Sequence, residues 1–172
     1  MEFGPVTTGE IGAAHGVYLE VVAWLRAKGV RQWVRALPPE EFAARQARGE
    51  LFAARLEGRL AGIVTLAFEE DHDWAEVVGP DRNWWLKTLA VSRACRGRNL
   101  GGQVMQACEV HLRQAGAREV WLECIEAGFL PDYYARLGYE VIKRKSVTYP
   151  SGNTFPVSLM RKRVAEDAPT SS

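Results

Sequence analysis

One segment of the chain is rich in small residues and arginines. It follows an apolar run and precedes apolar residues at helical spacing. The segment comprises Leu89, Ala90 and Val91 at the end of the run, and then Arg96, Gly97, Arg98, Asn99, Leu100, Gly101 and Gly102. The first turn of a helix leaves backbone N–H groups without intrahelical partners, and with the helix dipole these groups bind phosphate anions. Gly101 and Gly102 let a phosphate approach the backbone, while Arg96 and Arg98 add positive charge. We therefore predict that this segment grips a phosphate group of a ligand.

Two common nucleotide-binding motifs do not fit the segment. It lacks the Gly-Lys-Ser/Thr sequence of a P-loop and the GxGxxG sequence of a dinucleotide-binding fold. Neither class of nucleotide site is therefore predicted here.

The spacing of apolar residues predicts the elements that position this segment. Helices are expected over residues 11–25, 39–48, 101–115 and 131–138, and strands over residues 51–56, 60–68, 84–91, 120–125, 139–149 and 155–160. Residues 69–73 and 79–80 are expected to be loop. The phosphate-binding segment thus connects a central strand to an amphipathic helix, in which Leu100, Val104, Cys108 and Leu112 recur every four residues.

A second group of reactive side chains lies one helix and one strand further along. Residues 132–139 read Asp-Tyr-Tyr-Ala-Arg-Leu-Gly-Tyr. This segment resembles the aromatic-Tyr-x-x-Leu-Gly-aromatic motif of the GNAT superfamily of acyl-CoA N-acyltransferases. Arg96, Asn99 and Gly101 resemble the family's other signature, Arg/Gln-x-x-Gly-x-Gly/Ala, which precedes it. The resemblance covers residues 84–164 well and the N-terminal half in topology only.

Two positions depart from the family pattern. Asn99 stands where the family usually has glycine, but asparagine tolerates a left-handed backbone, so we expect the loop to keep its shape. Ala127 stands where many members carry an asparagine that contacts the pantetheine arm of the cofactor. The resemblance then implies that backbone groups mainly hold the arm.

The resemblance and the element order together imply an α/β fold. Its sheet is mixed, mostly antiparallel and twisted, with about six to seven strands splayed at the centre and about four flanking helices. One domain over residues 1–164 and a polar tail over residues 165–172 are expected.

The resemblance also implies an activity, the transfer of an acetyl group from acetyl-CoA to a primary amine by direct attack. Backbone N–H groups from Leu89 to Val91 would hold the pantetheine and polarise the thioester carbonyl. Tyr134 aligns with the family's tyrosine and would donate a proton to the leaving thiolate. The alternative for Tyr134 is a packing residue between helix and sheet.

An amine is mostly protonated at neutral pH, so a base or a water relay has to remove a proton before attack. The candidate groups are acidic or imidazole side chains near the expected site, namely Glu69, Glu70, Asp71, His72, Asp73, Glu123 and Glu126. The sequence does not choose among them, and each could also be an ordinary surface group.

Several other residues have two interpretations. Trp33 and Trp74 lie in expected loops and could line an acceptor pocket or pack in the core. Lys87, between apolar residues of the central strand, either extends past the strand end or meets one of the acids. The basic triplets 143–145 and 161–163 are expected on a solvated strand face, and the less favoured alternative is a basic edge that binds nucleic acid or the 3′-phosphate of the cofactor.

Composition excludes some classes of protein. The 172 residues carry 22 Lys and Arg against 21 Asp and Glu, so bulk charge gives no reason to expect nucleic acid. No apolar run approaches the roughly 18 residues needed to cross a bilayer, so a cytoplasmic protein is expected. Three cysteines without CxxC spacing and three scattered histidines favour neither disulfides nor a metal site.

The acceptor is left open. A small-molecule amine is favoured, and aminoglycosides, polyamines, amino acids, protein N-termini and lysines all stay open, because acceptor loops vary where the cofactor site does not. A non-catalytic acyl-CoA-binding module is the alternative from another class. A homodimer through the C-terminal hairpin or a sheet edge also stays open.

Overall fold

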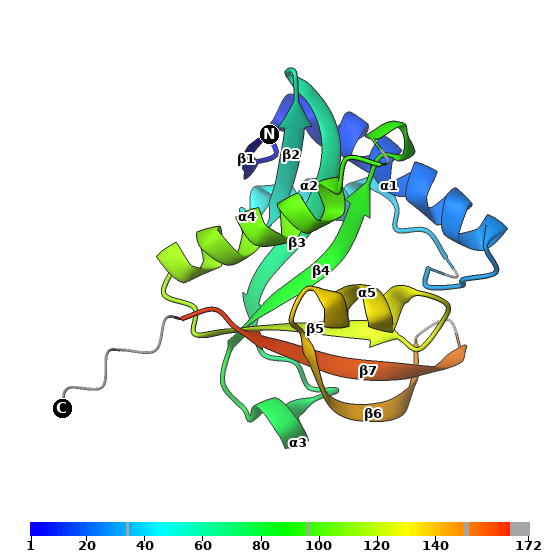
Figure 1. The fold of residues 1–172 in the computed structure, drawn as a ribbon, viewed down its shortest axis with the longest axis vertical. Coiled ribbons are helices and arrows are strands. Elements are labelled where there is room, and N and C mark those ends of the chain that lie inside the picture. Colours follow the sequence, from blue (N-terminus) through cyan, green and yellow to red (C-terminus); the bar gives the residue numbers. More distant parts are fainter. Residues whose placement is uncertain (34, 96, 150–151, 166–172) are drawn as a thin grey trace.

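One mixed sheet runs through the part of the chain that this computed structural model describes, which is residues 1–33, 35–95, 97–149 and 152–165. Its strands follow the order β1-β2-β3-β4-β5-β7-β6 (Figure 1). They are β1 (Glu2–Pro5), β2 (Leu51–Leu56), β3 (Arg59–Glu69), β4 (Asn83–Val91), β5 (Glu119–Ile125), β6 (Glu140–Thr148) and β7 (Thr154–Arg163). Neighbouring strands are antiparallel except β4 and β5, which are parallel. The predicted α/β fold is confirmed.

The helices flank this sheet. They are α1 (Ile11–Ala27), α2 (Pro39–Ala47), α3 (Ala75–Val78), α4 (Leu100–Gln114) and α5 (Leu130–Arg136). In Figure 1, α4 crosses in front of the upper strands, with α1 and α2 behind them. Four of these helices match the predicted ones. The sequence did not predict α3, a single turn, or β1, a four-residue edge strand that contains Gly4 and Pro5. The expected tail lies, apart from Ala165, outside the described residues.

Alternation along β5 divides its side chains between two cores. Val120, Leu122 and Cys124 join the larger core, which includes buried residues of α1, α2, α4 and α5. Trp121 and Ile125 point the other way and join a smaller core with Trp74, Trp85, Val147, Val157 and Leu159. Glu123 shares this second face, because successive side chains of a strand alternate.

The sheet opens between its two parallel strands. The pairing of β4 with β5 consists of a single position, Trp85 opposite Trp121. On the other edge of β4, the register with β3 slips between Ile63, opposite Ala90, and Thr65, opposite Lys87. This bulge places an extra residue in β4 and turns its C-terminal half away from β5. The predicted splay at the central strands is therefore present.

The bulge contains a strained residue with a dedicated support. Thr88 has φ 52°, a left-handed conformation that is rare for a β-branched residue. Arg45 of α2 donates through Nη1 to Thr88 Oγ1 at 2.7 Å and to Thr65 Oγ1 at 3.0 Å. Its Nε donates to Glu41 at 2.9 Å. Helix α2 thus fixes the shape of the opening through one side chain.

Candidate functional site

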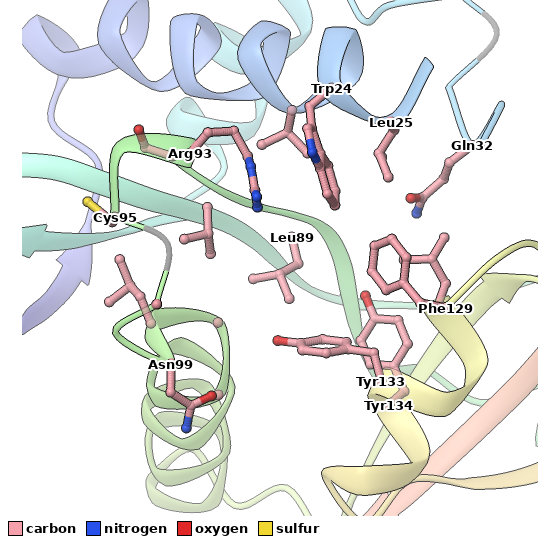
Figure 2. A pocket seen from close by; sticks show the side chains of 18 residues that line it. Trp24, Leu25, Gln32, Leu89, Arg93, Cys95, Asn99, Phe129, Tyr133 and Tyr134 are labelled. Atoms are coloured by element: carbon pink, nitrogen blue, oxygen red, sulfur yellow. The ribbon is translucent and has the colours of Figure 1, made fainter. Parts of the chain in front are cut away.

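A cavity of about 280 Å³ lies where the end of β4, the start of α4, α1 and α5 meet (Figure 2). Most of the predicted cofactor segment lines it, namely Leu89, Val91, Gly97, Asn99, Leu100, Gly101 and Gly102, together with the predicted catalytic residue Tyr134. The fold therefore brings two motifs that are distant in sequence to one cavity, which we call the donor cavity.

Two predicted residues do not line the donor cavity, and a third lies outside the described residues. Ala90 is 1% exposed and packs in the larger core. Arg98 is exposed, and its carbonyl accepts a hydrogen bond from Gln103 Nε2. Neither is among the residues that line the donor cavity. Arg96 lies outside the described residues. The binding roles of these three residues stay predictions.

The first turn of α4 has the features of an anion site. Asn99 has φ 48° and ψ 33°, the left-handed backbone expected for it. The first intrahelical bond runs from Gln103 N–H to the Asn99 carbonyl, so the N–H groups of Leu100, Gly101 and Gly102 have no partner within the helix. All three residues line the donor cavity. The residues present therefore fit a phosphate-bearing ligand.

Gly101 and Gly102 leave little room for a larger residue. A Cβ on Gly101 would lie 2.5 Å from the Tyr133 hydroxyl, and a Cβ on Gly102 would lie 2.9 Å from Asn99 Oδ1. Both distances are shorter than van der Waals contact. A larger residue at either position would have to displace a side chain that lines the cavity.

Sequence reasoning missed the residues that α1 and the start of α5 supply. Trp24 and Phe129 lie with ring centroids 5.6 Å apart, and the Arg93 guanidinium lies 4.0 Å from the centroid of Trp24. Glu20 accepts hydrogen bonds from Arg93 N–H at 2.6 Å and Ser92 Oγ at 3.0 Å, which ties α1 to the end of β4. Trp24 follows ordinary helical spacing, so no local signal marked it as a cavity residue.

Tyr134 and Tyr133 project from α5 toward the donor cavity (Figure 2). Tyr134 is 8% exposed, and its hydroxyl forms no hydrogen bond with a described residue. Burial raises the pKa of Tyr134, so the phenol keeps its proton at neutral pH. Burial also raises the pKa of Tyr133, to about 12. Tyr134 thus offers a free proton donor.

A second cavity of about 300 Å³ adjoins the donor cavity. Its lining includes aromatic and charged side chains, namely Trp33, Asp71, Asp73, Trp85, Lys87, Glu123 and Tyr149. Gln32, Leu89 and Tyr134 line both cavities. We call the second space the acceptor-side cavity. A ligand in each would meet the other at Leu89 and Tyr134.

Glu123 is held in place in the wall of the acceptor-side cavity. Its carboxylate accepts hydrogen bonds from Trp74 Nε1 at 2.8 Å and from the Tyr149 hydroxyl at 2.5 Å. Burial and this bond to Glu123 raise the pKa of Tyr149, so the phenol remains the donor. The suggestion that Trp74 lines an acceptor pocket is wrong: Trp74 is fully buried and orients Glu123, whereas Trp33 lines the cavity.

The remaining candidate bases are engaged elsewhere or lie outside the lining. Glu69 pairs with Lys87, which settles the partner of that lysine. Glu126 accepts a hydrogen bond from Ser158 and pairs with Arg144 at 3.0 Å, and the Ser158 bond lowers the pKa of Glu126. Glu70 and His72 are exposed and are not among the residues lining the cavity. Asp71, Asp73 and Glu123 are the candidates that line it.

The basic triplets are paired with acids. Lys143 and Lys145 pair with Glu76, Arg144 with Glu126, Arg161 with Glu119 and Glu140, Lys162 with Glu109, and Arg163 with Glu119. These pairs support the interpretation of a solvated strand face.

The three cysteines lie in different surroundings. Cys108 and Cys124 are buried, and burial raises the pKa of Cys124 to about 12, while Cys95 lines the donor cavity. Among the described residues there is no cluster of three metal-ligating side chains. Within the same part of the chain, no helix has the length and apolar character to cross a bilayer.

Comparisons with known proteins agree with this geometry. A sequence model described as "Acetyltransferase (GNAT) family" matches residues 17–139. The chain is 27% identical over 133 residues to "Uncharacterized N-acetyltransferase YesJ" from Bacillus subtilis. The aligned region covers 73% of each protein.

Solved structures show the same fold. A GNAT-family acetyltransferase from Streptococcus agalactiae matches with a TM-score of 0.81 and 15% identity over 96% of both chains. The structure of yncA, a putative acetyltransferase from Salmonella typhimurium with its cofactor acetyl-CoA, matches with a TM-score of 0.69 and 16% identity, over 100% of this chain and 98% of the other.

Proposed function

Since the chain belongs to the acetyltransferase (GNAT) family, we propose that it transfers the acetyl group of acetyl-CoA to a primary amine of a small molecule. One observation carries the proposal: the donor and acceptor-side cavities share Leu89 and Tyr134. A thioester in the first cavity and an amine in the second would meet beside a strand edge and a free phenol.

The donor cavity suits acetyl-CoA. The unpaired N–H groups of Leu100, Gly101 and Gly102 would hold its pyrophosphate. The edge of β4 beyond Trp85 has no strand partner toward β5, so backbone groups near Leu89 are available to the pantetheine arm. The yncA structure, named with acetyl-CoA, supports this choice of cofactor.

Residues of the two cavities have separate roles in direct transfer. Acetyl-CoA supplies the activated acetyl group as a thioester. Glu123, oriented by Trp74 and Tyr149, accepts the proton that the ammonium group has to lose. Backbone N–H groups near Leu89 stabilise negative charge on the carbonyl oxygen as the C–N bond forms. Tyr134 gives its proton to sulfur as the C–S bond breaks, and the second proton that the nitrogen loses as the amide forms returns the Tyr134 phenolate to its protonated form.

The volume of the acceptor-side cavity favours a small molecule. About 300 Å³ is at the lower end of the range for small-molecule pockets. Its walls come from loop residues, strands and α5, so a compact amine is enclosed from several directions.

The test is a CoA-release assay over a panel of amines, with mass spectrometry to locate the added acetyl group. We expect release of CoA with at least one small amine, and one acetyl group on its nitrogen. Acetyl-CoA binding without CoA release for any small amine or peptide would favour a non-catalytic binding module. Release with peptides alone would favour a protein acetyltransferase.

A further inference from the structure

The acceptor-side cavity carries more negative than positive charge. Three carboxylates line it, those of Asp71, Asp73 and Glu123, against one ammonium group, that of Lys87. Lys87 is already paired with Glu69, a fourth carboxylate. The two groups that hold Glu123 are neutral donors, so among the described residues its charge has no ion-pair partner. A ligand with positive charge would balance this lining.

Aromatic rings also line this cavity. Trp33, Trp85 and Tyr149 line the same space, and aromatic faces attract organic cations. Lys87 Nζ lies 5.7 Å from the centroid of Trp85, and outside the lining Lys145 Nζ lies 3.9 Å from that of the buried Trp74. Carboxylates together with aromatic rings are the combination that recognises an alkylammonium group.

The cavity wall also contains a polar group without a partner. Trp85 is 1% exposed, and its indole N–H forms no hydrogen bond with a described residue. A buried donor left unsatisfied is costly, so it is normally completed by water or a ligand. The wall of the acceptor-side cavity therefore includes a residue whose polar group no described residue satisfies.

The reacting nitrogen cannot itself carry the balancing charge. It has to be neutral to attack, and Glu123 is assigned to take its proton. The positive charge that Asp71 and Asp73 balance therefore belongs to a different part of the acceptor. An amino acid would fit poorly, because its carboxylate would face three carboxylates and a lysine that is already paired.

We propose that the acceptor is a small amine with a second positive charge, such as a linear diamine, whose distal ammonium group is bound by Asp71, Asp73 and the aromatic wall. This inference rests on the proposed acetyl transfer and specifies its substrate class.

The experiment compares three four-carbon amines at equal ionic strength: putrescine, n-butylamine and γ-aminobutyrate, which carry a distal cation, no charge and an anion. We expect kcat/KM to fall in that order, with putrescine ahead of butylamine by roughly tenfold, or ~1.4 kcal/mol. Putrescine has two equivalent amines and butylamine has one, and this difference alone raises kcat/KM by only a factor of two. Equal values for putrescine and butylamine would overturn the inference and leave acetyl transfer standing.

Matched variants test whether Asp71 and Asp73 bind the distal ammonium group. In Asp71→Asn with Asp73→Asn, the preference for putrescine should fall toward the factor of two. Asn at position 71 keeps the oxygen that accepts the Asp73 N–H at 3.1 Å, and the melting temperature checks folding. Asp73→Asn alone provides a second test. Asp81→Asn, in an exposed loop outside the lining, should leave the preference unchanged.

Two outcomes contradict the inference at different levels. A double variant that keeps the full preference would show that these carboxylates do not bind the distal charge. If the wild-type chain releases CoA with none of the three amines and with no member of the wider panel, the proposed function fails and the substrate class fails with it.

Discussion

One free hydroxyl, that of Tyr134, lies where the two cavities meet. Burial keeps it protonated, and no described residue uses its proton. The adjacent Tyr133 lines the donor cavity but not the acceptor-side cavity. The two tyrosines are therefore a natural matched pair for separating chemistry from binding.

Tyr134→Phe should lower kcat by roughly 100-fold, because the sulfur would leave without a proton donor. Acetyl-CoA affinity should stay within about twofold, since the ring still fills its place. Steady-state kinetics and calorimetry measure the two quantities. Tyr133→Phe should change kcat by less than about threefold. Equal loss in both variants would show that Tyr134 has no special catalytic role.

Gly101 carries a second test at the residue scale. In Gly101→Ala the new Cβ would collide with the Tyr133 hydroxyl and push that ring into the donor cavity. Overpacking of this size predicts roughly tenfold weaker acetyl-CoA binding by calorimetry.

Adding Tyr133→Phe to that variant should restore most of the affinity, because the next ring atom is 3.5 Å from the Cβ. Gly12→Ala, on α1 with open space around its Cβ, is the control and should bind normally. Lack of restoration in the double variant would mean that the collision is not what weakens binding.

At the scale of elements, α2 holds the bulge of β4 through Arg45. Arg45→Ala would leave the hydroxyl of Thr65, which is 2% exposed, and that of Thr88 without a donor. We expect a loss of about 1–3 kcal/mol in the free energy of unfolding, and a fall in kcat because Leu89 follows the bulge directly. Chemical denaturation and steady-state kinetics measure both.

Arg48→Ala is the matched control on the same helix. The Arg48 side chain is 52% exposed and pairs with Glu50, so its loss should change stability by no more than about 0.5 kcal/mol. If the two variants behaved alike, the support of the bulge by Arg45 would be refuted.

At the scale of the whole molecule, Glu10 links the N-terminal segment to β2 and makes stability depend on pH. Hydrogen bonding to Arg55 lowers the pKa of Glu10 from 4.5 to about 2. The ionised form therefore stabilises the fold above about pH 4.5, and that stabilisation is lost as pH falls from 4.5 toward 2.

Glu10→Gln should accordingly flatten the fall of stability across this acidic range, as measured by denaturation at a series of pH values. Glu57→Gln, in an exposed turn, should follow the wild-type curve. If Glu10→Gln also followed that curve, Glu10 would not contribute to acid sensitivity.

The sequence predicted the parts of the molecule whose signals are local. Helical periodicity located α1 and α4, and turn residues with apolar runs located most strands. Asn99 was expected in the left-handed backbone that the structure shows. Glu123 could only be one of several candidates, because its orientation depends on Trp74 and Tyr149, which are 49 and 26 residues away. The strand β1 and the helix α3 were not predicted, because each is too short to show a periodic pattern of apolar residues.

Cavity walls were harder to predict than motifs. Trp24 and Arg93 come together through contacts between α1 and the end of β4 that no sequence spacing encodes. Trp74 was considered for a pocket but is buried, since only the packing of the smaller core decides which indole faces a cavity. Long-range packing thus determined the acceptor side.

The central proposal is direct transfer between the two adjoining cavities, and initial-rate kinetics with acetyl-CoA and the best amine tests it most directly. We expect intersecting lines in double-reciprocal plots, and no gain of an acetyl group by the protein when it is incubated with acetyl-CoA alone. Parallel lines, together with one acetyl group on the chain at Cys95 in the donor cavity, would contradict direct attack.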